Sequence, residues 1–241
     1  MMRINQFAKT DLQLIRRDGI LLVGIFAPII LALLIRFLIP VLEKWLMENY
    51  SFSLESYHVA ILAMAFLTVP SMLGMMAGFL LLDDMDEGML AYYAVTPMRK
   101  SGYMRYRIGS TLLLTFLLFF AVHLVADLVE LPEVACVLLA LLFALEAPIF
   151  ALMLANFANN KVEGLALNKV LSVSVTLPLL LFFIPGSFKW LLAILPPFWP
   201  VMAMAAGVGG AGSFAVYMIG GVAVHALYIG VLYRMFIKKT E

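Results

Sequence analysis

Six long apolar segments, separated by short polar ones, dominate the pattern of hydrophobic and polar positions along the chain. They run over about residues 19–40, 57–82, 103–128, 132–157, 166–185 and 212–236. A helix that crosses a bilayer needs about 20 predominantly apolar residues, and each segment reaches that length. The pattern therefore predicts an all-α integral membrane protein with six transmembrane helices. The even number of spans places both termini on one side.

The segment before the first span has a helical pattern of a different kind. Apolar residues recur there at helical spacing, while polar and charged residues fill the opposite face. This arrangement is typical of an amphipathic helix that lies along a membrane surface. We expect an N-terminal amphipathic interface helix over residues 1–18, acting as a simple anchor or also framing a surface for a partner. Because this polar lead differs from a signal peptide, we expect the first span to be retained.

The stretch between spans five and six, residues 186–211, contains too much proline and glycine for one continuous helix. Its apolar run over residues 188–195 is too short to cross a bilayer, and the sequence PPFWP ends it. We expect short broken helices that dip into the outer leaflet, packed against protein because lipid does not tolerate unpaired backbone. An ordinary outer loop is the alternative. Without an internal repeat or a linker in the sequence, residues 1–241 are read as one domain.

Basic residues indicate on which side of the membrane each loop lies, because short loops rich in Lys and Arg stay in the cytoplasm. Of the 16 basic residues, four precede span one, four lie between spans two and three or in the first turns of span three, two lie between spans four and five or near the start of span five, and three lie at or after the end of span six. The opposite side holds Lys44 and Lys189, with Arg36 near the outer end of span one. Both termini are therefore expected in the cytoplasm.

The composition agrees with a membrane location, since 64% of the 241 residues are hydrophobic and 13% are charged. A soluble domain of this length cannot bury so much apolar surface. The net charge of +1 gives no reason to expect a nucleic-acid partner. Cys136 is the single cysteine, so the sequence allows no intrachain disulfide and suggests no cysteine-based metal site.

The segment LLDDMDEGMLAYYAVTPMRK, residues 81–100, interrupts the apolar chain with four carboxylates in five positions: Asp83, Asp84, Asp86 and Glu87. Clustered carboxylates can hold Mg²⁺ for chemistry on a lipid-linked substrate. Such an enzyme generally needs a second carboxylate cluster, and the other predicted cytoplasmic acids stand singly. The sequence also lacks a phosphate-binding GxxxxGK[ST] loop, an HExxH pair and a nucleophilic Ser elbow. A Mg-dependent enzyme is therefore kept as an alternative only.

A short cytoplasmic helix within residues 83–101 explains the same segment differently. Acidic residues at its start suit a helix N-terminus, and Thr96 and Pro97 end it. Its middle, GMLAYYAV, offers aromatic and aliphatic side chains flanked by charge, which is typical of a docking surface.

Glu146 is predicted near the middle of span four, in LFALEAPIF, two residues before Pro148. A carboxylate at that depth is unfavourable, seldom faces lipid and by default indicates a functional site. His123 in span three and His225 in span six are its possible partners. A role in the substrate pathway or in proton handling, and a structural hydrogen bond between helices, both stay open.

Several of these segments together resemble the membrane subunit of ABC-2-type ABC transporters, with some similarity to drug and fluoroquinolone export permeases. The resemblance lies in KTDLQLIRRDG, DDMDEGMLAYYAVTPMRKSGYMRYRI, ANNKVEGLALNKV and LPPFWP, and it covers nearly the whole chain. It implies two six-span permease subunits in the cytoplasmic membrane of a bacterial cell, identical or paired with a sister permease. It also implies that each docks a separate ABC ATPase subunit, which binds ATP and Mg²⁺, while this chain itself carries no cofactor.

The resemblance further implies that the segment between spans two and three is a coupling helix that sits in a groove of the ATPase. The residues in the matching positions are Asp86, Glu87, Gly88, Tyr92, Thr96 and Pro97. Glu146 matches no family motif. The leading hypothesis is a permease that exports a small amphipathic compound, drug or peptide antibiotic. The alternatives are the Mg-dependent enzyme, a proton-coupled carrier that uses Glu146, and a non-transporting immunity protein of the same fold.

Overall fold

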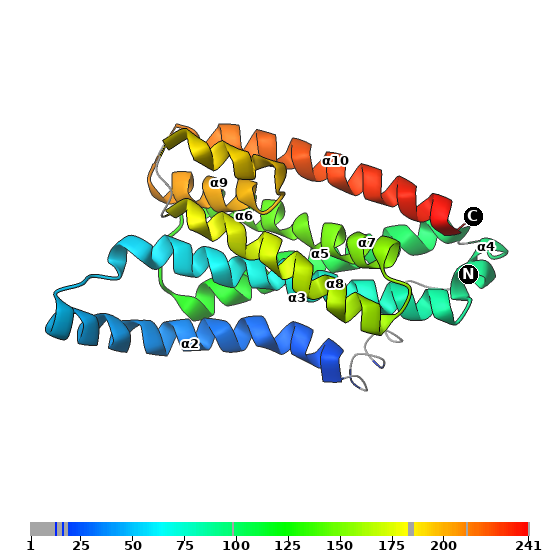
Figure 1. Ribbon diagram of the computed structural model, residues 1–241, viewed down its shortest axis with the longest axis horizontal. Coiled ribbons are helices and arrows are strands. Elements are labelled where there is room, and N and C mark those ends of the chain that lie inside the picture. Colours follow the sequence, from blue (N-terminus) through cyan, green and yellow to red (C-terminus); the bar gives the residue numbers. More distant parts are fainter. Residues whose placement is uncertain are drawn as a thin grey trace.

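The structure is a computed structural model that describes residues 13, 16, 19–97, 99–182, 186–210 and 212–240. These residues form a long bundle of helices with no strand among them (Figure 1). Six segments are long and apolar enough to cross a membrane: Leu21–Tyr50, Glu55–Asp86, Arg99–Ala126, Glu133–Phe157, Lys161–Phe182 and Phe214–Thr240. The predicted all-α fold with six spans is confirmed. The interface helix expected over residues 1–18 lies outside the described residues, apart from Gln13 and Arg16.

The first three spans are α2 (Gly19–Tyr50), η1 (Glu55–Tyr57) followed by α3 (His58–Asp86), and α5 (Arg99–Ala126). The last three are α6 (Glu133–Ala144) with α7 (Glu146–Phe157), α8 (Lys161–Thr176) with the 3-10 helix η2 (Leu177–Phe182), and α10 (Phe214–Thr240). Three short helices connect them: α4 (Met89–Ala94), η3 (Gly186–Ile194) and α9 (Phe198–Val208). The depth of η3 and α9 in a bilayer stays a prediction.

Helix α2 continues well beyond the predicted end of span one. Pro40 lies inside it, because a proline removes one backbone hydrogen bond without preventing the helix on either side of it. The residues that follow include Leu, Glu, Lys and Met, which are good helix formers and carry the helix to Tyr50.

Helices α3 and α7 form the centre of the bundle because small residues let their backbones approach closely. A Cβ atom added to Gly74 of α3 would lie 2.5 Å from the carbonyl oxygen of Ala147 in α7. In the most apolar stretch of span four 72% of the residues are buried, and 61% in span two, against 17–22% in the other four spans. Spans two and four are therefore the core, and the other spans surround it.

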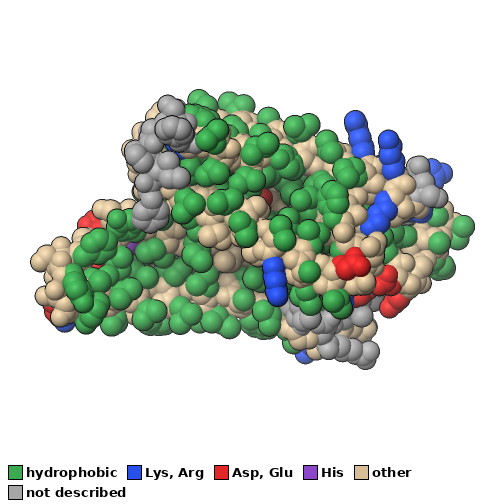
Figure 2. Space-filling view, in the orientation of Figure 1, with side chains coloured by type: hydrophobic (Ala, Val, Ile, Leu, Met, Phe, Trp, Pro, Cys, Tyr) green, Lys and Arg blue, Asp and Glu red, His purple; other side chains and the backbone are tan. Residues whose placement is uncertain are grey.

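The two ends of the bundle differ from its flank. Hydrophobic side chains cover most of the visible flank, whereas charged side chains gather toward the ends (Figure 2). We call the end that carries α4, the end of α3 and the end of α10 the α4 end (Figure 1). Helix α2 begins toward this end, while its last residues and η1 lie at the opposite end (Figure 1).

Candidate functional site

Helix α4 stands at the α4 end, between α3 and α5. The chain turns into it at Gly88, whose φ of 69° lies in the left-handed region that glycine enters without strain. Leu90 and Tyr93 are buried against the bundle, whereas Tyr92 and Val95 are 54% and 85% exposed. The helix is thus fixed on one side and presents large apolar side chains on the other.

The acidic residues belong to the end of α3 and not to the start of α4, so the expectation that they begin the short helix is wrong. Asp83, Asp84 and Asp86 lie in the last two turns of α3, and Glu87 is its C-cap. The helix continues through them because the break in the chain comes only at Gly88. Since a helix C-terminus carries partial negative charge, carboxylates there need cationic partners.

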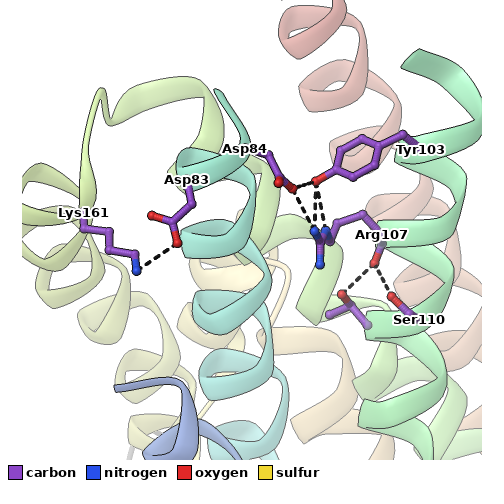
Figure 3. A network of polar contacts seen from close by, with 7 residues as sticks. Asp83, Asp84, Tyr103, Arg107, Ser110 and Lys161 are labelled. Atoms are coloured by element: carbon purple, nitrogen blue, oxygen red, sulfur yellow. Dashed lines mark hydrogen bonds and ion pairs between the residues drawn. The ribbon is translucent and has the colours of Figure 1, made fainter. Parts of the chain in front are cut away.

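Asp84 finds its partners on α5 (Figure 3). An Nη2 atom of Arg107 lies 2.8 Å from its Oδ2, and the hydroxyl of Tyr103 donates to the same oxygen. The guanidinium also donates to the Tyr103 oxygen from Nε at 3.1 Å and from Nη2 at 3.0 Å. Arg107 is only 4% exposed. A charge so buried is tolerated because it is paired and because several of its donors are used.

Asp83 points to the other side of α3 and pairs with α8 (Figure 3). Its Oδ2 lies 2.9 Å from Nζ of Lys161, the first residue of α8. Both side chains are about one third exposed, so solvent weakens this ion pair. The α4-end network, which consists of Asp83, Asp84, Tyr103, Arg107 and Lys161, therefore joins α3 to both α5 and α8.

Helix α4 contacts this network through an aromatic stack. The rings of Tyr93 and Tyr103 lie 4.8 Å apart, at an angle of 15°. The hydroxyl of Thr96 donates to the Tyr93 carbonyl at 2.9 Å, which helps to end α4. Because the Tyr103 hydroxyl is bonded to both Asp84 and Arg107, a displacement of α4 would act directly on α3 and α5.

The coupling residues expected from the sequence all lie around α4. Those that are exposed are Asp86, Glu87, Gly88, Tyr92 and Pro97, while Thr96 is half-buried. Tyr103, Arg107 and Lys161 were not identified from the sequence, although they hold the acids in place. The available signal was the four-residue spacing of Tyr103 and Arg107, which puts both side chains on one face of α5.

The arrangement of the acids also bears on the metal-site alternative. Asp83 and Asp84 face opposite sides of α3 and pair with cations of this same chain. Within the described residues, no group of three or more His, Cys, Asp and Glu side chains is placed to hold a metal ion. The geometry favours a structural role for both aspartates.

A second polar site lies in the interior, where α6 ends and α7 begins. Pro148 has no N–H to donate to the Ala144 carbonyl, so the helix of span four is interrupted at Leu145. Glu146 is the first residue of α7. Its Oε1 lies 2.9 Å from Nε2 of His225 in α10. Glu146 and His225, which we call the buried pair, are 1% and 0% exposed.

The hydrogen bonds of His225 determine how many protons the buried pair holds. Nδ1 lies 2.7 Å from the Gly221 carbonyl, which can only accept, so Nδ1 carries a proton. One further proton then lies between Nε2 and Glu146, on either partner, and the pair is neutral overall in both cases. Oε2 of Glu146 has no hydrogen-bond partner among the described residues. The pair ties α7 to α10 and leaves one buried acceptor open.

His123 is not brought to this site. It lies in α5 with its ring 6.1 Å from that of Phe66, and its Nδ1 is buried without a hydrogen-bond partner among the described residues. Of the two histidines proposed as partners of Glu146, His225 is therefore the one in contact.

Comparisons with known proteins support a membrane transport role. A family model described as "Fluoroquinolones export permease protein Rv2686c-like" matches residues 11–233. Two similar relatives are the fluoroquinolones export permease proteins MT2760 and Rv2686c, from Mycobacterium tuberculosis strains CDC 1551 / Oshkosh and ATCC 25618 / H37Rv. Each is 30% identical over 237 residues, which cover 97% of this chain and 93% of the relative. No solved structure matches the chain.

Proposed function

This chain belongs to the Rv2686c-like family of fluoroquinolone export permeases, and we propose that it is the membrane subunit of an ATP-driven exporter. In this proposal the α4 end faces the cytoplasm, a separate ATPase subunit binds there, and a second permease subunit completes the pathway. The exported compounds are small amphipathic drugs of the kind that gives the relatives their name.

The observation that carries the proposal is the two-sided character of α4. Its outer side presents Tyr92 and Val95 to solvent beside the acids Asp86 and Glu87. Large apolar side chains that stay exposed at the charged end of a membrane protein favour a protein partner, since aromatic residues are enriched at such contacts. Its inner side is stacked on the α4-end network.

The same geometry supports a way of transmitting force. An ATPase that moves α4 would push the Tyr93–Tyr103 stack, which is bonded to Asp84 of α3 and Arg107 of α5. Helix α3 lies at the centre of the bundle against α7, so its displacement would reach the core. Rigid-body shifts of packed helices of this kind are an established form of conformational switching.

A binding measurement tests the docking step. The full chain in nanodiscs is titrated with the ATPase subunit that copurifies with it, first as wild type and then as Tyr92→Ala. Loss of an aromatic anchor is expected to weaken binding about tenfold or more. Tyr50→Ala is the matched control, because Tyr50 is 67% exposed at the opposite end. Equal affinity of wild type and Tyr92→Ala would remove α4 from the docking surface.

A proton-coupled carrier remains the second candidate because the buried pair holds a transferable proton and an open acceptor. The two functions differ in what Glu146→Gln does. A glutamine amide still donates to Nε2 of His225, so an ATP-driven exporter would keep most of its transport. A carrier that moves protons through Glu146 would lose drug transport driven by a pH gradient altogether.

A further inference from the structure

The exposed face of α8 differs in character from that of α2. In the most apolar stretch of span five only 17% of the residues are buried, so most of this span faces outward. The exposed residues of α8 and η2 are Val162, Glu163, Leu165, Ala166, Lys169, Val170, Ser172, Val173, Thr176 and Leu180. At 100° per residue, Lys169 and Thr176 point in nearly the same direction, with Ser172 beside them. A charge and two hydroxyls thus lie along the middle of this face.

Helix α2 shows what a lipid-facing surface looks like in the same bundle. Its exposed residues around the middle of the span are Ile30, Leu33, Leu34, Phe37 and Leu38, and they are all large and apolar. Arg36, the basic residue within this stretch, reaches the Val125 carbonyl at 3.2 Å and Asp127 at 3.4 Å, at the end of α5. The charge on α2 therefore has partners within the bundle.

Lys169 has no ion-pair partner among the described residues. Lys161, at the start of α8, is held by Asp83 at the α4 end. Lys169 follows eight residues later, which corresponds to about 12 Å along the helix. A charge within a spanning helix commonly faces protein or a water-filled cavity and is a functional-site hypothesis by default.

A groove continues the face beyond Lys169. It is a shallow surface groove of about 300 Å³, lined by Ser172, Val173, Thr176, Leu177 and Leu180; a comparable groove of about 340 Å³ on α2 has a wholly apolar lining, so the hydroxyls are what distinguish the α8 groove. The hydroxyls of Ser172 and Thr176 donate to carbonyls one turn back, at 2.8 and 3.0 Å, so their oxygens remain available as acceptors. The groove therefore combines an apolar floor with hydroxyl oxygens, and a cation stands at one end of it. This chemistry fits an apolar body that carries a carboxylate.

We propose that this face of α8 lines the transport pathway and that Lys169 binds the carboxylate of an exported amphipathic acid. The inference rests on the proposed export function and adds a substrate group and the residue that recognises it. A charged ammonium–carboxylate contact in a partly desolvated groove is short and strong compared with a neutral hydrogen bond.

Cysteine labelling tests whether the face meets water, independently of any substrate. Thr176→Cys and Leu34→Cys are made in a Cys136→Ala background, which removes the single native thiol. Membranes containing the full chain and its ATPase are treated with a charged methanethiosulfonate reagent. Thr176→Cys is expected to react and to be protected by norfloxacin, while Leu34→Cys, on the apolar face of α2, stays unreacted. If Thr176→Cys reacts no faster than Leu34→Cys, α8 faces lipid and the proposal fails.

Transport measurements test the role of Lys169. Norfloxacin, which has a free carboxylate, is compared with its methyl ester in ATP-driven uptake by inside-out vesicles. Lys169→Ala is expected to reduce uptake of the acid about tenfold or more, as for one hydrogen bond to a charged group, and to leave the ester near wild type. Lys169→Arg should restore uptake of the acid. An equal loss for acid and ester would contradict carboxylate binding.

The two measurements also distinguish a failure of the Lys169 assignment from a failure of the proposed export function on which it rests. If wild-type vesicles take up neither compound although Thr176→Cys is labelled, the export function fails and with it the substrate assignment. If wild type exports both compounds and Lys169→Ala does so equally well, only the present inference is overturned.

Discussion

The α4-end network and the buried pair both hold helices together, and they are built in opposite ways. In the network, Asp84 shares hydrogen bonds with Arg107 and Tyr103 close to the protein surface, and its side chain is 16% exposed. In the buried pair, Glu146 and His225 make one contact with each other, away from solvent. The α4-end network thus has several connections and is partly accessible to water, whereas the buried pair has one connection and no access to water.

This difference predicts how each assembly responds when a member is removed. In the network a lost partner leaves another in place, and water reaches the exposed edge. In the buried pair a lost partner leaves a polar group with nothing to bond, and such a group is strongly destabilising. We therefore expect the interior to dominate stability and the α4 end to dominate coupling.

The largest effect is expected from His225→Leu. It leaves Glu146 buried without its partner, which should lower the free energy of unfolding by about 3–5 kcal/mol. Thermal unfolding of the detergent-solubilised chain measures this. Glu146→Gln is the control, because it keeps a donor for His225 and should unfold within a few degrees of wild type. If His225→Leu unfolds at the same temperature as Glu146→Gln, the buried pair contributes little to stability.

Arg107→Met comes next and tests the network. It leaves Asp84 with the Tyr103 hydroxyl, so the free energy of unfolding should fall by about 1–3 kcal/mol, less than in the interior. ATPase binding should persist while drug transport per ATP hydrolysed falls, because α4 still docks but acts less firmly on α3 and α5. Arg107→Lys should recover part of the coupling, since an ammonium supplies charge without the planar fork. Unchanged transport per ATP in Arg107→Met would contradict the transmission route.

The smallest effect is expected from Lys161→Ala. The ion pair with Asp83 is about one third exposed, and pairs of this kind contribute about 0–1 kcal/mol. High salt should have little further effect on the variant, whereas it should bring wild type down to the same unfolding temperature. A loss as large as that of Arg107→Met would show that α3 and α8 depend on each other more than the geometry indicates.

The length of the apolar segments was sufficient to predict the six spans, because the bilayer requires long apolar helices whatever their packing. It was insufficient at the end of α3, where the helix runs through Asp83, Asp84 and Asp86 until Gly88 breaks it. The prediction placed the boundary at the change from apolar to acidic residues. The actual boundary depends on backbone conformation, and partners on α5 and α8 offset the unfavourable charges.

The sequence showed which polar residues lie in the spans, but it was harder to predict which residues they pair with. Glu146 was recognised from its depth alone, yet the choice between His123 and His225 depends on how α5 and α10 pack around α7. Arg107 was counted as a loop cation, although Tyr103 and Asp84 bury it in the protein. Such pairings come from the arrangement of helices far apart in the sequence, and a single sequence does not specify it.

We propose that α4 transmits movement of an ATPase to the membrane helices. The most direct test of this proposal is ATP-dependent norfloxacin uptake by inside-out vesicles that contain this chain and its ATPase. We expect uptake by wild type and Tyr50→Ala, and uptake reduced about tenfold or more in Tyr92→Ala because the docking contact is weakened. Wild-type rates in Tyr92→Ala, or uptake driven by a pH gradient in the absence of ATP, would contradict this proposal.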